Sequence, residues 1–252
     1  MISKNKNVIL EVGSHDGLDG LALSLYNPNI YVYSFEPNKD LNKIYLKNKK
    51  KIEKFFNIKI QNHQIIKEAV SNFDGISYFN ISQNTALSSL NNFHKKNKFN
   101  DFFKSKIKVK TTKLNTFLKK EKIKNILYLH IDAQGSDLMV LKGLDKNIKN
   151  IYKGVIETAK DKKIQRYEGE STLKEVLNFF KLHEFIINRK VHNFNNFEFN
   201  IYFTNRNFIK DKDLIKVKTN YNPRFFRRII DNKSNYKDLI FKHLLKIYTN
   251  IF

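Results

Sequence analysis

Short apolar runs alternate with polar, helix-compatible stretches through the first 204 residues of the chain. Runs that are rich in β-branched and aromatic residues, or that alternate apolar with polar positions, predict strands. The predicted strands cover residues 8–12, 30–35, 65–70, 76–79, 107–111, 126–131, 154–157, 185–188 and 197–203. The first predicted helix begins at about residue 18. Further helices are predicted over residues 37–56, 114–118, 136–142 and 172–182.

Strands that alternate with helices and then end in an antiparallel pair predict an α/β fold. We expect an open, mostly parallel sheet with helices on both faces, whose last strand is inserted in the reverse direction. The polar stretch 82–105 is interpreted as a surface insertion over the edge of the sheet, and 107–111 as an edge strand.

The chain is divided into a domain of residues 1–204 and a basic C-terminal helical extension of residues 205–252. This extension ends in a helix predicted from Tyr236, in which Ile240, Leu244 and Ile251 fall on one face. Basic residues accompany this apolar face. The extension is therefore interpreted as docking on the domain itself or as making peripheral contact with an anionic membrane.

Lys and Arg number 47 against 24 Asp and Glu, which gives a net charge of +23. A polyanionic partner would suit this excess, but the bias toward Lys, Asn and Ile is typical of an A+T-rich genome, so nucleic-acid binding is not expected. The absence of cysteine excludes disulfides, thiolate metal sites and Cys nucleophiles. Without a signal-like or membrane-spanning apolar run, the protein is expected to be soluble and cytoplasmic.

Acidic side chains follow several of the predicted strands, at the carboxyl ends where open α/β sheets bind their ligands. They are Glu11, Glu36, Glu68, Asp132 and Glu157. Gly13 and Gly17 form a G-x-x-x-G turn, but His15 and Leu18 stand where the dinucleotide fingerprint needs glycine. A nicotinamide-binding domain is therefore disfavoured.

A carboxylate at the end of the second strand can accept hydrogen bonds from a ribose diol, and Glu36 occupies that place. Together with an acid before the glycine turn, this favours S-adenosylmethionine, which has a ribose and a charged amino-acid end but no pyrophosphate. The predicted cofactor-binding residues are Glu11, Gly13, Ser14, His15, Gly17, Glu36, Pro37, Glu68, Ala69, Asp132 and Gln134.

An ordered series of short motifs resembles the FkbM-type methyltransferases. It comprises Glu11-Val12-Gly13-Ser14-His15-Asp16-Gly17, Phe35-Glu36-Pro37, Ala69-Val70-Ser71, Ser88-Ser89-Leu90, Thr112-Lys113-Leu114-Asn115-Thr116-Phe117, Ile131-Asp132-Ala133-Gln134-Gly135, Leu141-Lys142-Gly143 and Tyr167-Glu168-Gly169. The resemblance covers roughly residues 8–204. It implies a class I, Rossmann-like fold that depends on S-adenosylmethionine and, commonly, O-methylation of sugar or natural-product hydroxyls.

Three positions depart from the family pattern. The family usually has Lys where His130 stands, Asp where Asn115 stands, and Glu where Asp137 stands. These departures concern the acceptor side more than the cofactor side.

Asp132 is the first candidate for the base that removes the acceptor proton, because it ends the central buried strand. Its alternative is a carboxylate that caps the helix beginning near Ser136. His130 is a second candidate, although a histidine inside an apolar strand more often belongs to the core. Glu157 either contacts acceptor hydroxyls or pairs with a lysine.

No spacing typical of metal ligands occurs, so no metal site is expected. The other histidines lack partner spacing and are expected at the surface, apart from His15 in the glycine turn. They are His63, His94, His183, His192 and His243.

The favoured function is methylation of a sugar hydroxyl in a glycan, a glycolipid or a related small molecule. An RNA methyltransferase is the alternative enzyme, supported by charge and by the aromatic and basic run Phe225-Phe226-Arg227-Arg228. A methyltransferase fold that serves as a non-catalytic binding module is the third possibility. The sequence does not indicate the oligomeric state.

Overall fold

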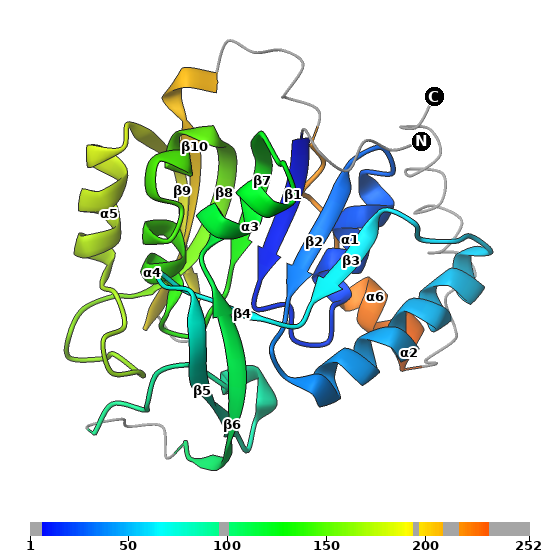
Figure 1. Ribbon diagram of the computed structural model, residues 1–252, viewed down its shortest axis with the longest axis horizontal. Helices are drawn as coiled ribbons and strands as arrows, with labels where there is room; N and C mark the ends of the chain where they lie inside the picture. The colour runs from blue at the N-terminus through cyan, green and yellow to red at the C-terminus, as the bar shows by residue number, and fades with distance from the viewer. Residues whose placement is uncertain (1–6, 96–100, 194–196, 209–216, 232–252) are drawn as a thin grey trace.

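The computed structural model describes residues 7–95, 101–193, 197–208 and 217–231. In this part of the chain, seven strands form one sheet in the order β3-β2-β1-β7-β8-β10-β9 (Figure 1). Their bounds are β1 Asn7–Val12, β2 Tyr31–Phe35, β3 His63–Ile66, β7 Asn125–Ile131, β8 Ile151–Ala159, β9 Phe185–Asn193 and β10 Glu198–Asn205. The pairs from β3 to β8 are parallel, and β10 runs antiparallel to both β8 and β9. The predicted parallel sheet with a reversed last strand is confirmed.

Helices cover both faces of this sheet because their apolar sides pack against it. One face carries α3 (Leu114–Lys120), α4 (Asp137–Lys142) and α5 (Leu173–Leu182). The other carries α1 (Leu18–Tyr26), α2 (Lys39–Phe56) and α6 (Pro223–Ile230). The start of α5 is a capping box, in which the side chains of Thr172 and Glu175 each accept a backbone N–H from the other residue.

A second, three-stranded sheet lies at the edge of the main sheet where its parallel strands end (Figure 1). Its order is β4 (Ala69–Val70), β6 (Phe103–Thr112) and β5 (Gly75–Ser82), with β4 parallel and β5 antiparallel to β6. The 3₁₀ turn η1 (Thr85–Leu87) follows β5. This small sheet places β4, β5 and η1 over the carboxyl ends of β1, β2 and β7.

Two strand predictions are wrong in detail. The single strand expected at 65–70 is two strands in different sheets, since β3 pairs with β2 whereas β4 pairs with β6. The strand at 107–111 is part of β6, the middle strand of the small sheet. The stretch 82–105, in its described part, contributes η1 to a cavity wall rather than only covering an edge.

The helix α6 was not predicted from the sequence. Its start is well specified locally, because the Asn222 side chain accepts the Phe225 N–H at 3.3 Å and Pro223 occupies the first turn. Phe225 and Phe226 are buried against α1 and α2. The helix predicted from Tyr236 lies outside the described residues.

Among the described helices, none combines the length and the apolar character needed to cross a membrane.

Candidate cofactor and active site

The turn after β1 holds the ends of three strands together. Gly13 and Ser14 donate their N–H groups to the Phe35 carbonyl at 3.1 and 3.0 Å, and Asp132 donates its N–H to the Val12 carbonyl at 2.9 Å. Gly13 has a φ of 84°, and a Cβ there would lie 1.8 Å from the Asp132 carbonyl oxygen. Only glycine fits this close approach, which explains one of the two glycines of the motif.

A cavity of about 450 Å³ opens over this turn. It brings together nine of the predicted cofactor-binding residues: Gly13, Ser14, His15, Glu36, Pro37, Glu68, Ala69, Asp132 and Gln134. Sequence reasoning missed the walls supplied by η1 and by α6, which include Thr85, Leu87, Pro223, Arg224 and Arg227. The α6 residues lie far from the motifs along the chain, whereas Thr85 and Leu87 lie just before the motif Ser88-Ser89-Leu90, which the sequence analysis did not assign to the site.

Glu36 is almost fully buried at the end of β2 and faces backbone donors. Its carboxylate accepts the His15 N–H at 3.0 Å and the Asn38 N–H at 2.8 Å. Burial outweighs these hydrogen bonds and raises the pKa of Glu36 to about 7. Each carboxylate oxygen still has a lone pair for a further donor, so Glu36 can accept two hydroxyl groups.

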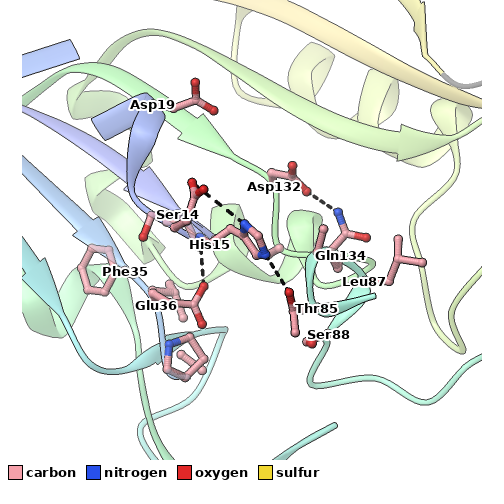
Figure 2. A pocket seen from close by; sticks show the side chains of 18 of the residues that line it. Ser14, His15, Asp19, Phe35, Glu36, Thr85, Leu87, Ser88, Asp132 and Gln134 are labelled. Carbon is pink, nitrogen blue, oxygen red and sulfur yellow. Dashed lines mark hydrogen bonds and ion pairs between the residues drawn. The ribbon is translucent and has the colours of Figure 1, made fainter. Parts of the chain in front are cut away.

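His15 lies between Glu36 and η1 (Figure 2). Its Nε2 is 2.9 Å from the Thr85 hydroxyl oxygen, a contact that links the glycine turn to η1. Burial lowers the pKa of His15, so the ring is neutral near pH 7. His15 therefore acts as a hydrogen-bonding wall of the cavity.

Asp132 occupies the end of β7, on the side of the cavity away from Glu36 (Figure 2). The Gln134 amide donates to the Asp132 carboxylate at 2.5 Å. The Gln134 side-chain oxygen accepts the Tyr167 hydroxyl at 2.8 Å, and its backbone oxygen accepts the Ser89 hydroxyl at 2.6 Å. Gln134 thus holds Asp132 in one orientation, and burial raises the pKa of Asp132 above its ordinary value.

The capping alternative for Asp132 is not what the structure shows, because Asp137 binds the turn. The Asp137 carboxylate accepts the Ala133 N–H at 2.8 Å and the Gly135 N–H at 3.0 Å. Asp132 is therefore left facing the cavity.

Four of the predicted site residues do not line this cavity: Glu11, Gly17, His130 and Glu157. Glu11 lies buried beneath the turn, where it accepts the Ser34 hydroxyl at 2.5 Å. Ligand-type atoms of Glu11, Asp19 and His130 lie within 4.8 Å of one another. Burial and the nearby Asp19 raise the pKa of Glu11 to about 8. Sequence spacing could not reveal the cluster of Glu11, Asp19 and His130, because β1, α1 and β7 each supply one of its residues.

The prediction that His63 lies at the surface is wrong. His63 is 5% exposed, and its Nε2 is 2.8 Å from the Ser34 hydroxyl oxygen. It begins β3, and its ring packs against Tyr45 of α2. Burial lowers the pKa of His63 to about 3, so this side chain is neutral.

Comparison with known proteins decides the family. A family model described as the methyltransferase FkbM domain matches residues 11–187. The chain belongs to the FkbM methyltransferase family. The resemblance drawn from the motifs is thereby confirmed, and the cofactor of this FkbM methyltransferase is S-adenosylmethionine.

One solved structure of this family shares the fold. The crystal structure of methyltransferase FkbM from Methylobacillus flagellatus KT is 14% identical, with a TM-score of 0.50 over 81% of this chain and 44% of that chain. This FkbM methyltransferase therefore spans less than half the length of that relative. TrmK from M. capricolum, in complex with S-adenosyl-homocysteine, is 13% identical with a TM-score of 0.45 over 98% of this chain and 90% of that one. No curated protein matches the chain significantly.

The cavity of this FkbM methyltransferase fits the cofactor on two observations. The buried hydroxyl of Ser14 has no hydrogen-bond partner among the described residues, so it is available to a ligand. The Glu36 carboxylate retains acceptor capacity at the place where a ribose diol is expected. Polar groups that lack partners inside a folded protein are rare, and a ligand is one explanation for them.

Proposed function

We propose that this FkbM methyltransferase transfers a methyl group to a sugar hydroxyl of a glycan, a glycolipid or a related small molecule, and that Asp132 is the base. The observation that carries the proposal is the Asp132 carboxylate at the cavity wall, held by the Gln134 amide at 2.5 Å. Neither of the other predicted bases, His130 and Glu157, lines the cavity.

The cofactor is proposed to lie across the cavity from the small sheet to the glycine turn. Apolar residues of the small sheet and its flank provide walls for a flat, apolar base; they include Ala69, Val70, Phe79 and Leu90. Glu36 accepts the ribose hydroxyls, and the glycine turn receives the methionyl end. Bound S-adenosylmethionine supplies a methyl group that is already activated on a sulfonium.

The residues of the chain therefore have to position the acceptor and remove its proton. Asp132 accepts the hydroxyl hydrogen and takes the proton as the oxygen attacks. Burial raises its pKa, which brings a carboxylate closer to the basicity that proton removal near neutral pH requires. Gln134 and Tyr167 keep the carboxylate aligned through their hydrogen bonds.

RNA methylation loses the aromatic part of its sequence support in this arrangement. Phe225 and Phe226 of α6 are 4% and 0% exposed and pack against α1 and α2, so neither ring is available to stack on a base. The arginines beside them remain exposed, and charge alone does not select RNA.

Transfer of radiolabel from S-adenosylmethionine tests both acceptor classes. We expect labelling of cell-surface glycans or lipid-linked saccharides and none of purified RNA. Asp132→Asn should lower turnover by about 10²- to 10⁴-fold, the usual range for a general base, while S-adenosylhomocysteine still binds.

Asp145→Asn is the matched control, since that exposed carboxylate lies outside the cavity and should leave turnover unchanged. If radiolabel is transferred to RNA and not to glycans, RNA replaces sugar hydroxyls as the acceptor. Normal turnover of Asp132→Asn would remove Asp132 as the base, and cofactor binding without transfer to any acceptor would favour the non-catalytic module.

A further inference from the structure

The helix α6 brings basic side chains to the cavity from outside the region that matches the family. The family match ends at residue 187, whereas α6 covers Pro223–Ile230. In Figure 1, α6 lies beside α1 and α2. Phe225 and Phe226 anchor it there. Pro223, Arg224 and Arg227 then line the cavity.

The two arginines of this wall differ in their partners. Arg227 Nη1 is 2.5 Å from the Asp16 carboxylate, so it pairs with the glycine turn. Arg224 lies one helical turn earlier on the same side of α6, and within the described residues no carboxylate pairs with it. Its guanidinium is exposed and always charged, so an anion of the ligand is a suitable partner.

The charge along the cavity indicates which part of the ligand carries that anion. Asp16, Asp19, Arg224 and Arg227 all lie at or beside the glycine turn, whereas the small sheet supplies mainly apolar wall. The methionyl end of the cofactor carries an ammonium and a carboxylate side by side. A wall with carboxylates and guanidinium groups together is complementary to that pair of charges.

We propose that Arg224 binds the methionyl carboxylate of the cofactor through its planar guanidinium fork. Arg227 supports this contact, because its ion pair with Asp16 fixes α6 against the glycine turn. The inference rests on the cofactor placement proposed above. It assigns the basic segment after the family domain a role in cofactor binding.

Two ligands that differ only at the amino-acid end give a direct test. S-adenosylhomocysteine carries the carboxylate, and 5′-methylthioadenosine retains the base and ribose but lacks it. By calorimetric titration, Arg224→Ala should weaken S-adenosylhomocysteine by about 10- to 100-fold, the usual loss for a charged hydrogen-bonded contact. The affinity for 5′-methylthioadenosine should stay within about twofold of the wild type.

Arg228→Ala is the control, since Arg228 belongs to the same helix but does not line the cavity. It should leave both affinities unchanged. Equal losses for the two ligands in Arg224→Ala would show a general disturbance of the site and overturn the inference. Unchanged affinity for both ligands would also overturn it, and a raised acceptor KM in that case would assign Arg224 to an anionic acceptor. If the wild type bound neither ligand, the proposed cofactor site itself would fail.

Discussion

At the residue scale, Glu36 makes cofactor binding depend on pH. In the free protein, burial raises the pKa of its carboxyl to about 7, so it is largely protonated below that pH. Ribose hydroxyls donate to the ionised form, so a bound cofactor lowers this pKa and releases a proton. The affinity for S-adenosylhomocysteine should therefore fall as the pH drops below about 7 and level off above it.

Titrations across about pH 5.5 to 8.5, repeated in buffers of different ionisation enthalpy, measure the affinity and the released proton. Glu36→Gln should bind more weakly and lose this pH dependence. The variant separates Glu36 from Asp137, whose pKa is also raised, to about 8. A pH profile that persists in Glu36→Gln would assign the proton to another group.

The sequence correctly placed acids at the ends of the strands but could not assign each one a direction. Glu36 and Asp132 line the cavity, whereas Glu11 turns under the glycine turn toward Ser34. Alternate residues of a strand face opposite sides, and a strand end borders both the cavity and the covering helices. The sequence therefore does not distinguish a strand-end carboxylate that binds a ligand from one that makes a buried polar contact.

At the scale of elements, the position of α6 depends on one fully buried ring. Phe226 packs between α1 and α2, edge-on to Tyr26 with 6.4 Å between ring centroids. A buried Phe→Ala change costs about 3–5 kcal/mol when the surroundings cannot collapse. An eight-residue helix is marginal without packing, so Phe226→Ala should release α6 rather than unfold the sheet.

Hydrogen exchange over residues 223–230 should accelerate in Phe226→Ala while β1 and β7 stay protected. The affinity for S-adenosylhomocysteine should fall as in Arg224→Ala, because Arg224 leaves the cavity with the helix. Leu182→Ala is a suitable control, since Leu182 is 81% exposed and lies outside the cavity. Loss of protection throughout the sheet would contradict separate release of α6.

Most elements and the parallel arrangement of the main sheet followed from the sequence pattern, whereas the division of the strands between two sheets did not. The runs at 8–12, 30–35 and 126–131 are strands of the main sheet, as expected. The run at 65–70 has the same apolar character on both sides of Lys67 and Glu68, yet its halves join different sheets. Pairing partners are set by tertiary packing, which a single strand pattern does not encode. α6 was missed because three arginines mask the apolar pair Phe225-Phe226 in a short segment.

At the scale of the whole molecule, part of the net charge of +23 comes from exposed lysines at alternate positions of one strand. The solvent-facing positions of β6 carry Lys104, Lys106, Lys108 and Lys110. Lys110 pairs with Glu68 at 2.6 Å, and Lys106 lies over the Tyr78 ring at 5.8 Å. The basic sequence after Asp231 adds Lys233, Lys237, Lys242 and Lys246, all of which lie outside the described residues.

We expect this distribution to attract anionic lipid surfaces, with residues 232–252 as the main contact because their sequence also offers apolar side chains. Each basic residue near such a surface contributes about 1 kcal/mol, so co-sedimentation with phosphatidylserine vesicles should be strong at low salt and weaken as salt screens it. Truncation after Asp231 should abolish this co-sedimentation and keep α6 in place. A truncation after Thr204 is unsuitable, because it would also remove the buried Phe225 and Phe226. Charge reversal of Lys104, Lys106 and Lys108 serves as the comparison. If the truncated protein still sediments with vesicles but the charge-reversed variant does not, β6 is the membrane contact instead. If the full-length protein stays in the supernatant at low salt, membrane contact is excluded.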